Sequence, residues 1–281
     1  MEQKITRPAL RYVGSKFRIS DWIIKHFPSH DCYVEPYGGA AAVLLRKNRS
    51  LLEVYNDMDE EVVNFFRVLR EKPVELIEAL RWTPYALREW ECAQKVEPEL
   101  DVVERARRFY IRSWMGIAGP TAQCNTGWRR QKMISKVNGR PKMVAAARLF
   151  MNVDSLYQVA ERWRGVQIEC GEAIEVIERY DTPNTLFYVD PPYLAETRGK
   201  RSKAAYRYEM DEDQHRELAM VLREIKGMAL ISGYPSALYD ELYGDWVYRD
   251  KWVRVNGAGS ALERLWLSPA AVEKQVQRLL I

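Results

Sequence analysis

Four consecutive residues, Asp190-Pro191-Pro192-Tyr193, combine groups that could hold a flat amine. They follow the apolar run 185–189, which has the length and residue types of a buried strand. Because proline cannot extend a central strand, the chain presents these groups at the strand's carboxyl end. A planar amine could donate one hydrogen to the Asp190 carboxylate and another to the Pro191 carbonyl, while the Tyr193 ring stacks on its plane. The alternative is an ordinary loop with a helix-capping aspartate and turn prolines.

Two segments near the amino end combine small residues and charges that suit a ligand. In Tyr12-Val13-Gly14-Ser15-Lys16, a Gly-Ser turn precedes a cation that could face an anionic group. The predicted strand 32–35 ends at Glu35 and continues into Pro36-Tyr37-Gly38-Gly39-Ala40-Ala41-Ala42, where small residues let a ligand approach the backbone. The apolar run 43–45 then predicts the start of a helix, whose N-terminus favours an anion. A ligand with a carboxylate and an adenosine would suit these turns; an ordinary turn and close helix–strand packing are the alternatives.

A third candidate for ligand binding is Asp57, which follows the predicted strand 51–55. An acidic residue about 20 positions after a glycine-rich turn commonly accepts hydrogen bonds from ribose hydroxyls. The turn contains only two glycines, so the full dinucleotide-binding fingerprint is absent. The alternative is that Asp57 or Asp59 caps a helix predicted over 60–69.

The composition limits the class of protein. With 281 residues, of which 47% are hydrophobic, the chain can bury a sizeable core and form two lobes. The net charge of +4 says little about partners, so local clusters matter more. Cys32, Cys92, Cys124 and Cys170 have no paired spacing, which argues against zinc and disulfides and favours a reducing cytoplasm. The start lacks an apolar run, and no stretch of about 18 apolar residues occurs, so we expect a cytoplasmic protein without a signal peptide or membrane span.

Predicted strands and helices alternate in residues 1–71 and again in 165–281, which indicates an α/β fold. Residues 72–164 read mainly as helices, which indicates an inserted lobe. Polar or special turns follow five of the predicted strands, at Glu35, Asn56-Asp57, Gly171-Glu172, Asp190 and 232–234. Because the ligand cleft of an open α/β sheet lies at the carboxyl ends of its strands, we expect these turns to meet there.

Basic residues cluster in the middle of the predicted lobe, where no acidic residue occurs from Gly127 to Arg148. Cations contact phosphates, and asparagine, arginine and an aromatic wedge can read or unstack bases. Asn138-Gly139 predicts a hairpin turn within this cluster. The candidate DNA contacts here are Asn125, Trp128, Arg129, Arg130, Lys132, Lys136 and Arg140. A second basic loop after Tyr193 adds Arg198, Lys200, Arg201 and Lys203. The alternative in both places is a solvated surface.

In this order the motifs resemble those of the Dam-type, alpha-class DNA adenine-N6 methyltransferases. The resemblance covers residues 10–70 and 165–270. It rests on Tyr12-Val13-Gly14-Ser15-Lys16, Val34-Glu35-Pro36-Tyr37-Gly38-Gly39-Ala40-Ala41, Asn56-Asp57, Asp190-Pro191-Pro192-Tyr193 and Leu265-Trp266-Leu267-Ser268-Pro269. Two positions depart from the family pattern: Ala41 replaces a motif glycine, and Gly171-Glu172 stands where the family often has an aspartate.

The resemblance implies a Rossmann-like, S-adenosylmethionine-dependent methyltransferase fold with an inserted, mostly helical DNA-recognition lobe. The implied parts are a first catalytic part, 1–71, a target-recognition lobe, 72–164, and a second catalytic part, 165–281. The implied partners are S-adenosylmethionine and double-stranded DNA, with no metal and no membrane; a cognate restriction endonuclease is a further candidate. The implied cofactor-binding residues are Tyr12, Gly14, Lys16, Glu35, Pro36, Tyr37, Gly38, Gly39, Ala40, Asp57 and Asp190. The implied residues around a flipped-out adenine are Asp190, Pro191, Pro192 and Tyr193.

The expected chemistry is methyl transfer to N6 of that adenine. The lone pair of the exocyclic amine is delocalised into the ring, which makes the amine a poor nucleophile. By accepting its two hydrogens, Asp190 and the Pro191 carbonyl would favour a more tetrahedral nitrogen, and positioning would contribute roughly 7–11 kcal/mol at best. The alternatives are cytosine N4 in DNA, adenine in RNA, and a catalytically silent DNA-binding module. A nicotinamide oxidoreductase would leave Asp190 to Tyr193 unexplained.

Overall fold

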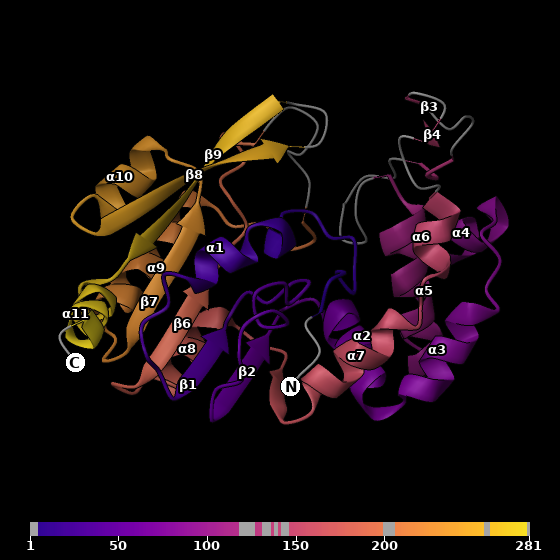
Figure 1. Cartoon of the computed structure of the whole chain (residues 1–281), viewed down its shortest axis with the longest axis horizontal. Helices are drawn as coiled ribbons and strands as arrows, with labels where there is room; N and C mark the ends of the chain where they lie inside the picture. The colour runs from indigo at the N-terminus through magenta and orange to yellow at the C-terminus, as the bar shows by residue number, and fades with distance from the viewer. Residues whose placement is uncertain are drawn as a thin grey trace.

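A mixed seven-stranded sheet forms the centre of the fold (Figure 1). The computed structural model describes residues 5–117, 127–130, 136–137, 140–141, 146–198, 206–255 and 259–279. The strands of the sheet are β1 (Cys32–Glu35), β2 (Leu52–Asn56), β5 (Val166–Glu169), β6 (Thr185–Val189), β7 (Met228–Gly233), β8 (Val247–Val255) and β9 (Gly259–Leu267). Their order is β5-β2-β1-β6-β7-β9-β8; the first five are parallel, and β9 and β8 are antiparallel. This arrangement confirms the expected Rossmann-like α/β fold.

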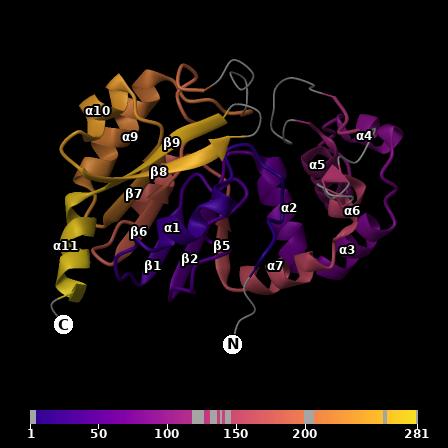
Figure 2. The same cartoon turned by 45° about the horizontal axis from the view of Figure 1, so that its top comes forward.

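Helices cover both faces of the sheet (Figures 1 and 2). One face carries α8 (Ala173–Arg179), α9 (Glu212–Glu224) and α10 (Ala237–Tyr243), and the other α1 (Ser20–Ile24), α2 (Glu60–Glu71), α7 (Ser155–Trp163) and α11 (Pro269–Leu279). Because side chains alternate along a strand, Tyr33 and Tyr55 join the core with α2 and α7, whereas Val34 and Val54 join the core with α8 and α9. None of the helices in the described ranges has the length and apolar composition to cross a membrane.

The chain between α2 and α7 forms a helical lobe to one side of the sheet (Figures 1 and 2). Its helices are α3 (Pro73–Arg81), α4 (Leu87–Ala93), α5 (Val102–Met115) and α6 (Ala146–Met151). Two short antiparallel strands, β3 (Lys136–Val137) and β4 (Arg140–Pro141), pair within it. Their pairing confirms the predicted hairpin, whose turn residues Asn138-Gly139 lie outside the described part of the chain.

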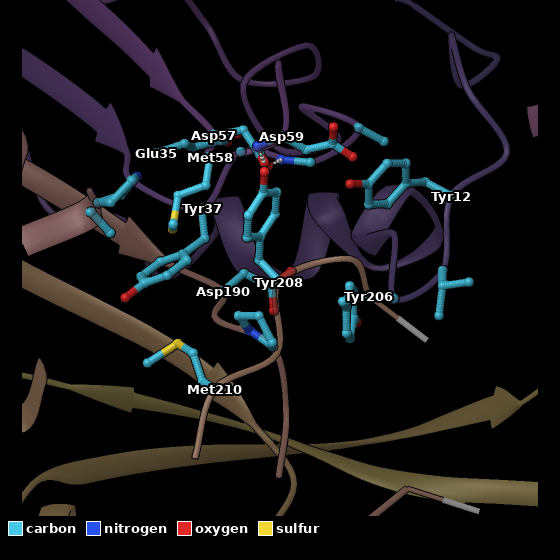
Figure 3. Close-up of a pocket in the computed structure, with 18 of the residues that line it drawn as sticks. Tyr12, Glu35, Tyr37, Asp57, Met58, Asp59, Asp190, Tyr206, Tyr208 and Met210 are labelled. Carbon is cyan, nitrogen blue, oxygen red and sulfur yellow. Dashed lines mark hydrogen bonds between the residues drawn. The ribbon is translucent and has the colours of Figure 1, made fainter. Parts of the chain in front are cut away.

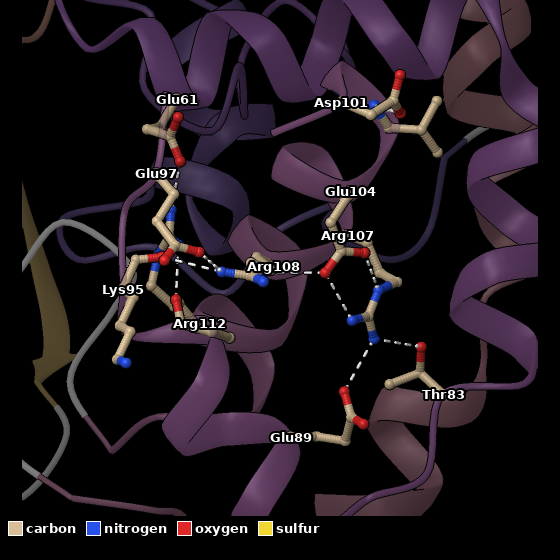
Figure 4. A network of polar contacts seen from close by, with 12 residues as sticks. Glu61, Thr83, Glu89, Lys95, Glu97, Asp101, Glu104, Arg107, Arg108 and Arg112 are labelled. Carbon is tan, nitrogen blue, oxygen red and sulfur yellow. Dashed lines mark hydrogen bonds and ion pairs between the residues drawn. The ribbon is translucent and has the colours of Figure 1, made fainter. Parts of the chain in front are cut away.

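Buried charges join this lobe to α2 (Figure 4). Glu61 on α2 accepts hydrogen bonds on one carboxylate oxygen from Arg105 and on the other from Arg112, both at 2.7 Å. Within the lobe itself, Arg107 of α5 donates to Glu104 at 2.9 Å and to Glu89 of α4 at 3.0 Å. Removal of one member of a buried pair leaves the other without its counter-charge, which costs more than breaking an exposed pair. The lobe is therefore held on α2 by paired charges as well as by apolar packing.

The helix predicted after the small-residue turn does not form. Residues 42–46 are turns, and Ala41 has a φ of 52°, in the left-handed region that a right-handed helix excludes. The Leu44 N–H donates to the Glu35 carboxylate at 2.7 Å instead of starting a helix. The prediction was wrong because the apolar run 43–45 gives no sign that a buried carboxylate takes this N–H. Two isolated helical hydrogen bonds form, Leu45 N to Ala41 O and Lys47 N to Val43 O, but no regular helix follows, and the anion that this turn faces is Glu35.

Substitution of Ala41 by glycine tests the backbone strain at this turn. Ala41 and Ala42 are both buried, at 0% and 8% exposure, but Ala41 alone of the two has a positive φ. We expect Ala42→Gly to lower the free energy of unfolding by about 1–2 kcal/mol, because a buried methyl group is lost and the unfolded chain gains entropy. Ala41→Gly should cost about 1 kcal/mol less, because it relieves the left-handed conformation. Chemical denaturation measures both values, and equal losses would contradict the strain.

Candidate active site

The turns after the parallel strands β1, β2 and β6 surround a cavity of about 440 Å³ (Figure 3). They meet at one edge because these strands run in the same direction. All the residues expected to bind a cofactor line this cavity: Tyr12, Gly14, Lys16, Glu35, Pro36, Tyr37, Gly38, Gly39, Ala40, Asp57 and Asp190. Pro192 also lines it. Among the described residues, no group of three or more His, Cys, Asp or Glu side chains could hold a metal ion.

Asp57 holds the glycine turn against the end of β2. Its Oδ2 accepts a hydrogen bond from Gly39 N at 2.8 Å, and the Tyr55 hydroxyl donates to Gly39 O at 2.7 Å. A Cβ added at Gly38 would lie 2.1 Å from the Tyr55 ring, so this position requires glycine. Burial raises the pKa of Asp57 to about 6. The helix cap considered as an alternative is Asp59, which accepts from Glu61 N at 3.1 Å.

Asn56 joins two neighbouring turns of the cavity wall. Its Nδ2 donates to Pro36 O and to Gly171 O, both at 2.9 Å, and its Oδ1 accepts from Gly171 N at 3.0 Å. The side chain is fully buried, so these three hydrogen bonds satisfy it without water. The turns after β1 and β5 are therefore fixed relative to each other before any ligand binds.

Glu35 is a buried carboxyl at the end of β1. Its Oε1 accepts hydrogen bonds from the Tyr33 hydroxyl and from Leu44 N, both at 2.7 Å. Burial raises the pKa of Glu35 to about 7, although these two donors oppose the shift. Near neutral pH this carboxyl therefore exists in both protonation states.

Lys16 is the centre of a buried charge cluster. Its Nζ lies 2.9 Å from Asp190 Oδ1 and 3.7 Å from Glu263 Oε1, and it donates to Gly14 O at 2.8 Å. The same ammonium lies 4.7 Å from the centre of the Tyr193 ring, and the Tyr193 hydroxyl donates to Glu263 Oε1. The sequence predicted Lys16, Asp190 and Tyr193 at the site but missed Glu263. Lys16 and Asp190 line the cavity, whereas Tyr193 and Glu263 contact Lys16 without being among the lining residues. A glutamate followed by the largely apolar run of β9 is the signal that could have found it.

Burial changes the ionisation of this cluster. It raises the pKa of Asp190, and the neighbouring Lys16 ammonium opposes the shift. For Lys16, burial alone would lower the pKa, but the carboxylates of Asp190 and Glu263 outweigh it and raise the pKa. Burial also raises the pKa of Glu263. Lys16 therefore stays protonated at neutral pH, and Asp190 takes up a proton at a higher pH than an exposed aspartate does.

Residues 206–210 cross the cavity, and Figure 3 shows the Tyr208 ring standing inside it. Arg207 Nη1 donates to Asp59 Oδ1 at 3.0 Å, which ties the segment to the start of α2. Tyr206, Tyr208 and Met210 line the cavity, and the sequence interpretation missed all three. The recurrence of large side chains at every second position after the basic loop is the signal that could have found them.

The expected DNA contacts occupy different environments. In the lobe Trp128 and Arg129 are half-buried and Arg130 is exposed, and the Trp128 ring lies 5.8 Å from that of Tyr85. Lys136 and Arg140 lie on the β3–β4 hairpin. Arg198, by contrast, is buried and paired with Glu209. The others lie outside the described residues: Asn125, Lys132, Lys200, Arg201 and Lys203.

Comparison with known proteins gives the family. A family model described as D12 class N6 adenine-specific DNA methyltransferase matches residues 12–256. The DNA adenine methylases of Salmonella typhi and of Escherichia coli (strain K12) are each 24% identical to the chain, over 85% of its length and 85% of theirs. The DNA adenine methylase of Haemophilus influenzae (strain ATCC 51907 / DSM 11121 / KW20 / Rd) is 37% identical over 65 residues, which are 23% of the chain and 22% of that protein. The motifs, the sheet and the match over most of the sequence agree, and the chain belongs to the D12 class of N6 adenine-specific DNA methyltransferases.

Proposed function

We propose that this DNA adenine methyltransferase uses S-adenosylmethionine as methyl donor and acts on an adenine flipped out of double-stranded DNA. The observation that carries the proposal is a single cavity that extends from the Gly38-Gly39 turn to the Asp190 carboxylate. A cofactor bound there would lie beside the group proposed to hold the target amine. Such positioning of two reactants is worth roughly 7–11 kcal/mol at best.

The lining of the cavity fits a ligand with a flat ring, hydroxyls and positive charge. Its volume of about 440 Å³ falls within the range of roughly 300–1,000 Å³ that is usual for small-molecule sites. Tyr12, Tyr37 and Tyr208 offer flat aromatic surfaces, and Glu35 and Asp57 offer carboxylates. Each Asp57 oxygen accepts one backbone N–H and keeps a further lone pair. We propose that these lone pairs accept hydrogen bonds from the ribose hydroxyls of the cofactor. When bound, S-adenosylmethionine supplies a methyl group on a positively charged sulfur.

In the proposed mechanism, Asp190 and the Pro191 carbonyl accept the two hydrogens of the target amine. The nitrogen becomes more tetrahedral, and its lone pair is available to form the bond to the methyl carbon. As that bond forms and the carbon–sulfur bond breaks, the nitrogen releases one hydrogen as a proton to the Asp190 carboxylate. Burial raises the pKa of Asp190, which makes it a better base than an exposed aspartate. Lys16, 2.9 Å away, holds the carboxylate in one orientation.

Tyr193 is proposed to stack on the flipped base. Its ring is largely buried and lies 4.8 Å from that of Tyr234, at an interplanar angle of 72°. The Lys16 ammonium lies over one face of the ring. A base that stacks on Tyr193 therefore has to use the opposite face or displace Lys16. Because the ring is already held in place, stacking would cost little side-chain entropy.

We propose residues 72–164 as the target-recognition lobe. The support is the one-sided charge of its central segment, the exposed side chain of Arg130 and the β3–β4 hairpin that carries Lys136 and Arg140. Lys and Arg side chains that neutralise phosphates give affinity that falls as salt rises. Arg198, a candidate DNA contact outside the lobe, is not proposed to bind phosphate, because its guanidinium is buried and paired with Glu209.

The first test is transfer of labelled methyl from S-adenosylmethionine to unmethylated double-stranded DNA, followed by mass analysis of the nucleosides. We expect N6-methyldeoxyadenosine. N4-methyldeoxycytidine, or transfer to RNA alone, would contradict the proposed substrate.

Two variants test Asp190: Asp190→Ala and the isosteric Asp190→Asn. Both should lower turnover by roughly 10²–10³-fold, because a positioned polar group is lost from the transition state. DNA affinity should stay within about 3-fold, since other residues carry the phosphate contacts; near-normal turnover of both variants would contradict the role of Asp190.

Arg130→Ala tests the lobe as the DNA-binding surface. We expect weaker binding to DNA of any sequence and a plot of log Kd against log salt whose slope falls by about 1, because one phosphate contact is lost. Arg164→Ala is the matched control. Arg164 ends the range 72–164, is also exposed and pairs with Glu161, but it follows α7, whose buried side chains belong to the core on one face of the sheet. Fluorescence anisotropy at several salt concentrations gives both slopes. Identical slopes for the two variants would place the contact elsewhere.

Glu35→Gln tests the cost of the buried carboxyl. Because burial raises the pKa of Glu35 to about 7, the folded state keeps a proton that the unfolded state, with a pKa near 4.3, has released. The contribution of Glu35 to stability therefore falls as pH rises from about 4.3 to 7, by up to about 4 kcal/mol. Glutamine keeps the acceptor for Tyr33 and Leu44, so the variant should be the more stable protein at pH 8 but not at pH 5. Urea denaturation at the two pH values measures this.

The control for that experiment is Glu53→Gln. Glu53 is also buried, but hydrogen bonds and charges from Arg162 and Lys47 outweigh burial and lower its pKa. Its contribution to stability is present above the unfolded pKa and is lost as pH falls through the folded one. Glu53→Gln should therefore destabilise the protein at pH 8. If both variants are more stable than the wild type at pH 8, the ion pairs of Glu53 with Arg162 and Lys47 do not offset the cost of its burial, and the expected difference between the two carboxylates is wrong.

A further inference from the structure

Glu263 is a buried carboxylate that the mechanism above does not use. It lies on β9, one residue before Arg264, the first β9 residue that pairs with β7, opposite Gly233. The side chains of alternate residues point to the same face, so Glu263 shares a face with Leu265 and Leu267, which belong to the apolar core. Its exposure is 3%. A charged side chain on this buried face of β9 needs a partner of opposite charge or a hydrogen-bond donor, because an unpaired buried charge is strongly disfavoured.

The partners of Glu263 are residues of the proposed base-binding site. The Tyr193 hydroxyl donates a hydrogen bond to Glu263 Oε1, and the same oxygen lies 3.7 Å from Lys16 Nζ. Lys16 Nζ in turn lies 2.9 Å from Asp190 Oδ1. One ammonium is therefore shared by two carboxylates, and the Tyr193 phenol beside that ammonium is hydrogen-bonded to the second of them.

Sharing of the ammonium changes what Asp190 can offer a substrate. With Asp190 as its only carboxylate partner, Lys16 would place its whole charge on the oxygens that must accept the amine hydrogens. A second carboxylate on the other side of Nζ divides that charge. With Lys16 protonated and both carboxylates ionised, the cluster carries one net negative charge, which suits the acceptance of hydrogens from a neutral amine. Tyr193 is held at the same time, because its hydroxyl has an anionic acceptor.

We propose that Glu263 is a positioning residue for methyl transfer, which orients the Tyr193 ring and shares Lys16 so that Asp190 keeps an oxygen for the target amine. The inference rests on the proposed function of the Asp190 site. Glu263 does not touch the reacting atoms in this scheme; it acts through Tyr193 and Lys16. Its effect should therefore appear in the rate of transfer and not in the binding of either reactant.

Glu263→Gln separates charge from hydrogen bonding. Glutamine can still accept from the Tyr193 hydroxyl but cannot share the Lys16 ammonium. With cofactor and DNA saturating, we expect the single-turnover rate constant to fall by roughly 10- to 100-fold, as a small misplacement of reacting groups produces. The dissociation constants for S-adenosylmethionine and for DNA should change by less than about 3-fold, a split that loss of folding alone would not produce.

A double-mutant cycle tests whether Glu263 acts through the phenol. Tyr193→Phe removes the donor, and the combined variant Tyr193→Phe with Glu263→Gln should be less impaired than the product of the two single effects. Additive effects, with Glu263→Gln itself as fast as the wild type, would overturn the inference. Failure of the wild type to transfer methyl to DNA would instead overturn the proposed function, so the two failures can be told apart.

Glu53→Gln is the matched control for a buried carboxylate shared by two cations. Glu53 on β2 lies close to Lys47 and Arg162, at 2.6 Å from each, but does not line the cavity. This variant should lower the thermal unfolding temperature and leave the single-turnover rate constant of the folded protein unchanged. If Glu263→Gln and Glu53→Gln lose rate only in proportion to the fraction unfolded, Glu263 is structural and the inference is wrong.

Discussion

The ammonium of Lys16 joins three segments that lie far apart in the sequence. Lys16 comes from the amino-terminal turn, Asp190 from the end of β6 and Glu263 from β9. A buried ammonium is tolerated only where anionic groups meet it, so these three segments have to converge for any of them to be buried. The convergence forms one end of the cavity. The position of the Asp190 carboxylate relative to the amino-terminal turn therefore depends on this one charged group.

In another part of the cavity wall, two carboxylates accept backbone N–H groups of the turn after β1. In many dinucleotide-binding folds a helix N-terminus after the first strand offers its N–H groups to an anion. Here Asp57 accepts Gly39 N–H and Glu35 accepts Leu44 N–H, so these donors are already used. The wall they leave is acidic. Such a wall favours a ligand with positive charge and hydroxyl donors, in agreement with the proposed cofactor.

The sequence predicted the strands and the turns that line the cavity, because each of these is a local pattern. The apolar run 185–189 has to stop as a strand at Asp190-Pro191-Pro192-Tyr193, because proline cannot extend a central strand. Parallel strands then bring their carboxyl ends together at one edge of the sheet. Ala41 could not be predicted in the same way, because its left-handed φ follows from how Glu35 is buried. The role of Glu263 depends on the register of β9 against β7, which no local pattern contains. The path of residues 206–210 over the cavity likewise depends on tertiary contacts such as Arg207 with Asp59.

The first turn of α2 connects the cavity with the helical lobe. Asp59 caps the helix and accepts a hydrogen bond from Arg207, in the segment that crosses the cavity. Two residues later, Glu61 holds Arg105 and Arg112 of α5. A displacement of α5 would therefore reach Asp59 through one turn of helix and not through a flexible loop. Because separation of buried ion pairs is costly, the lobe and the cavity segment are constrained to follow α2 together. The lobe proposed to bind DNA and the segment that crosses the cavity are therefore attached to one structural element, the first turn of α2.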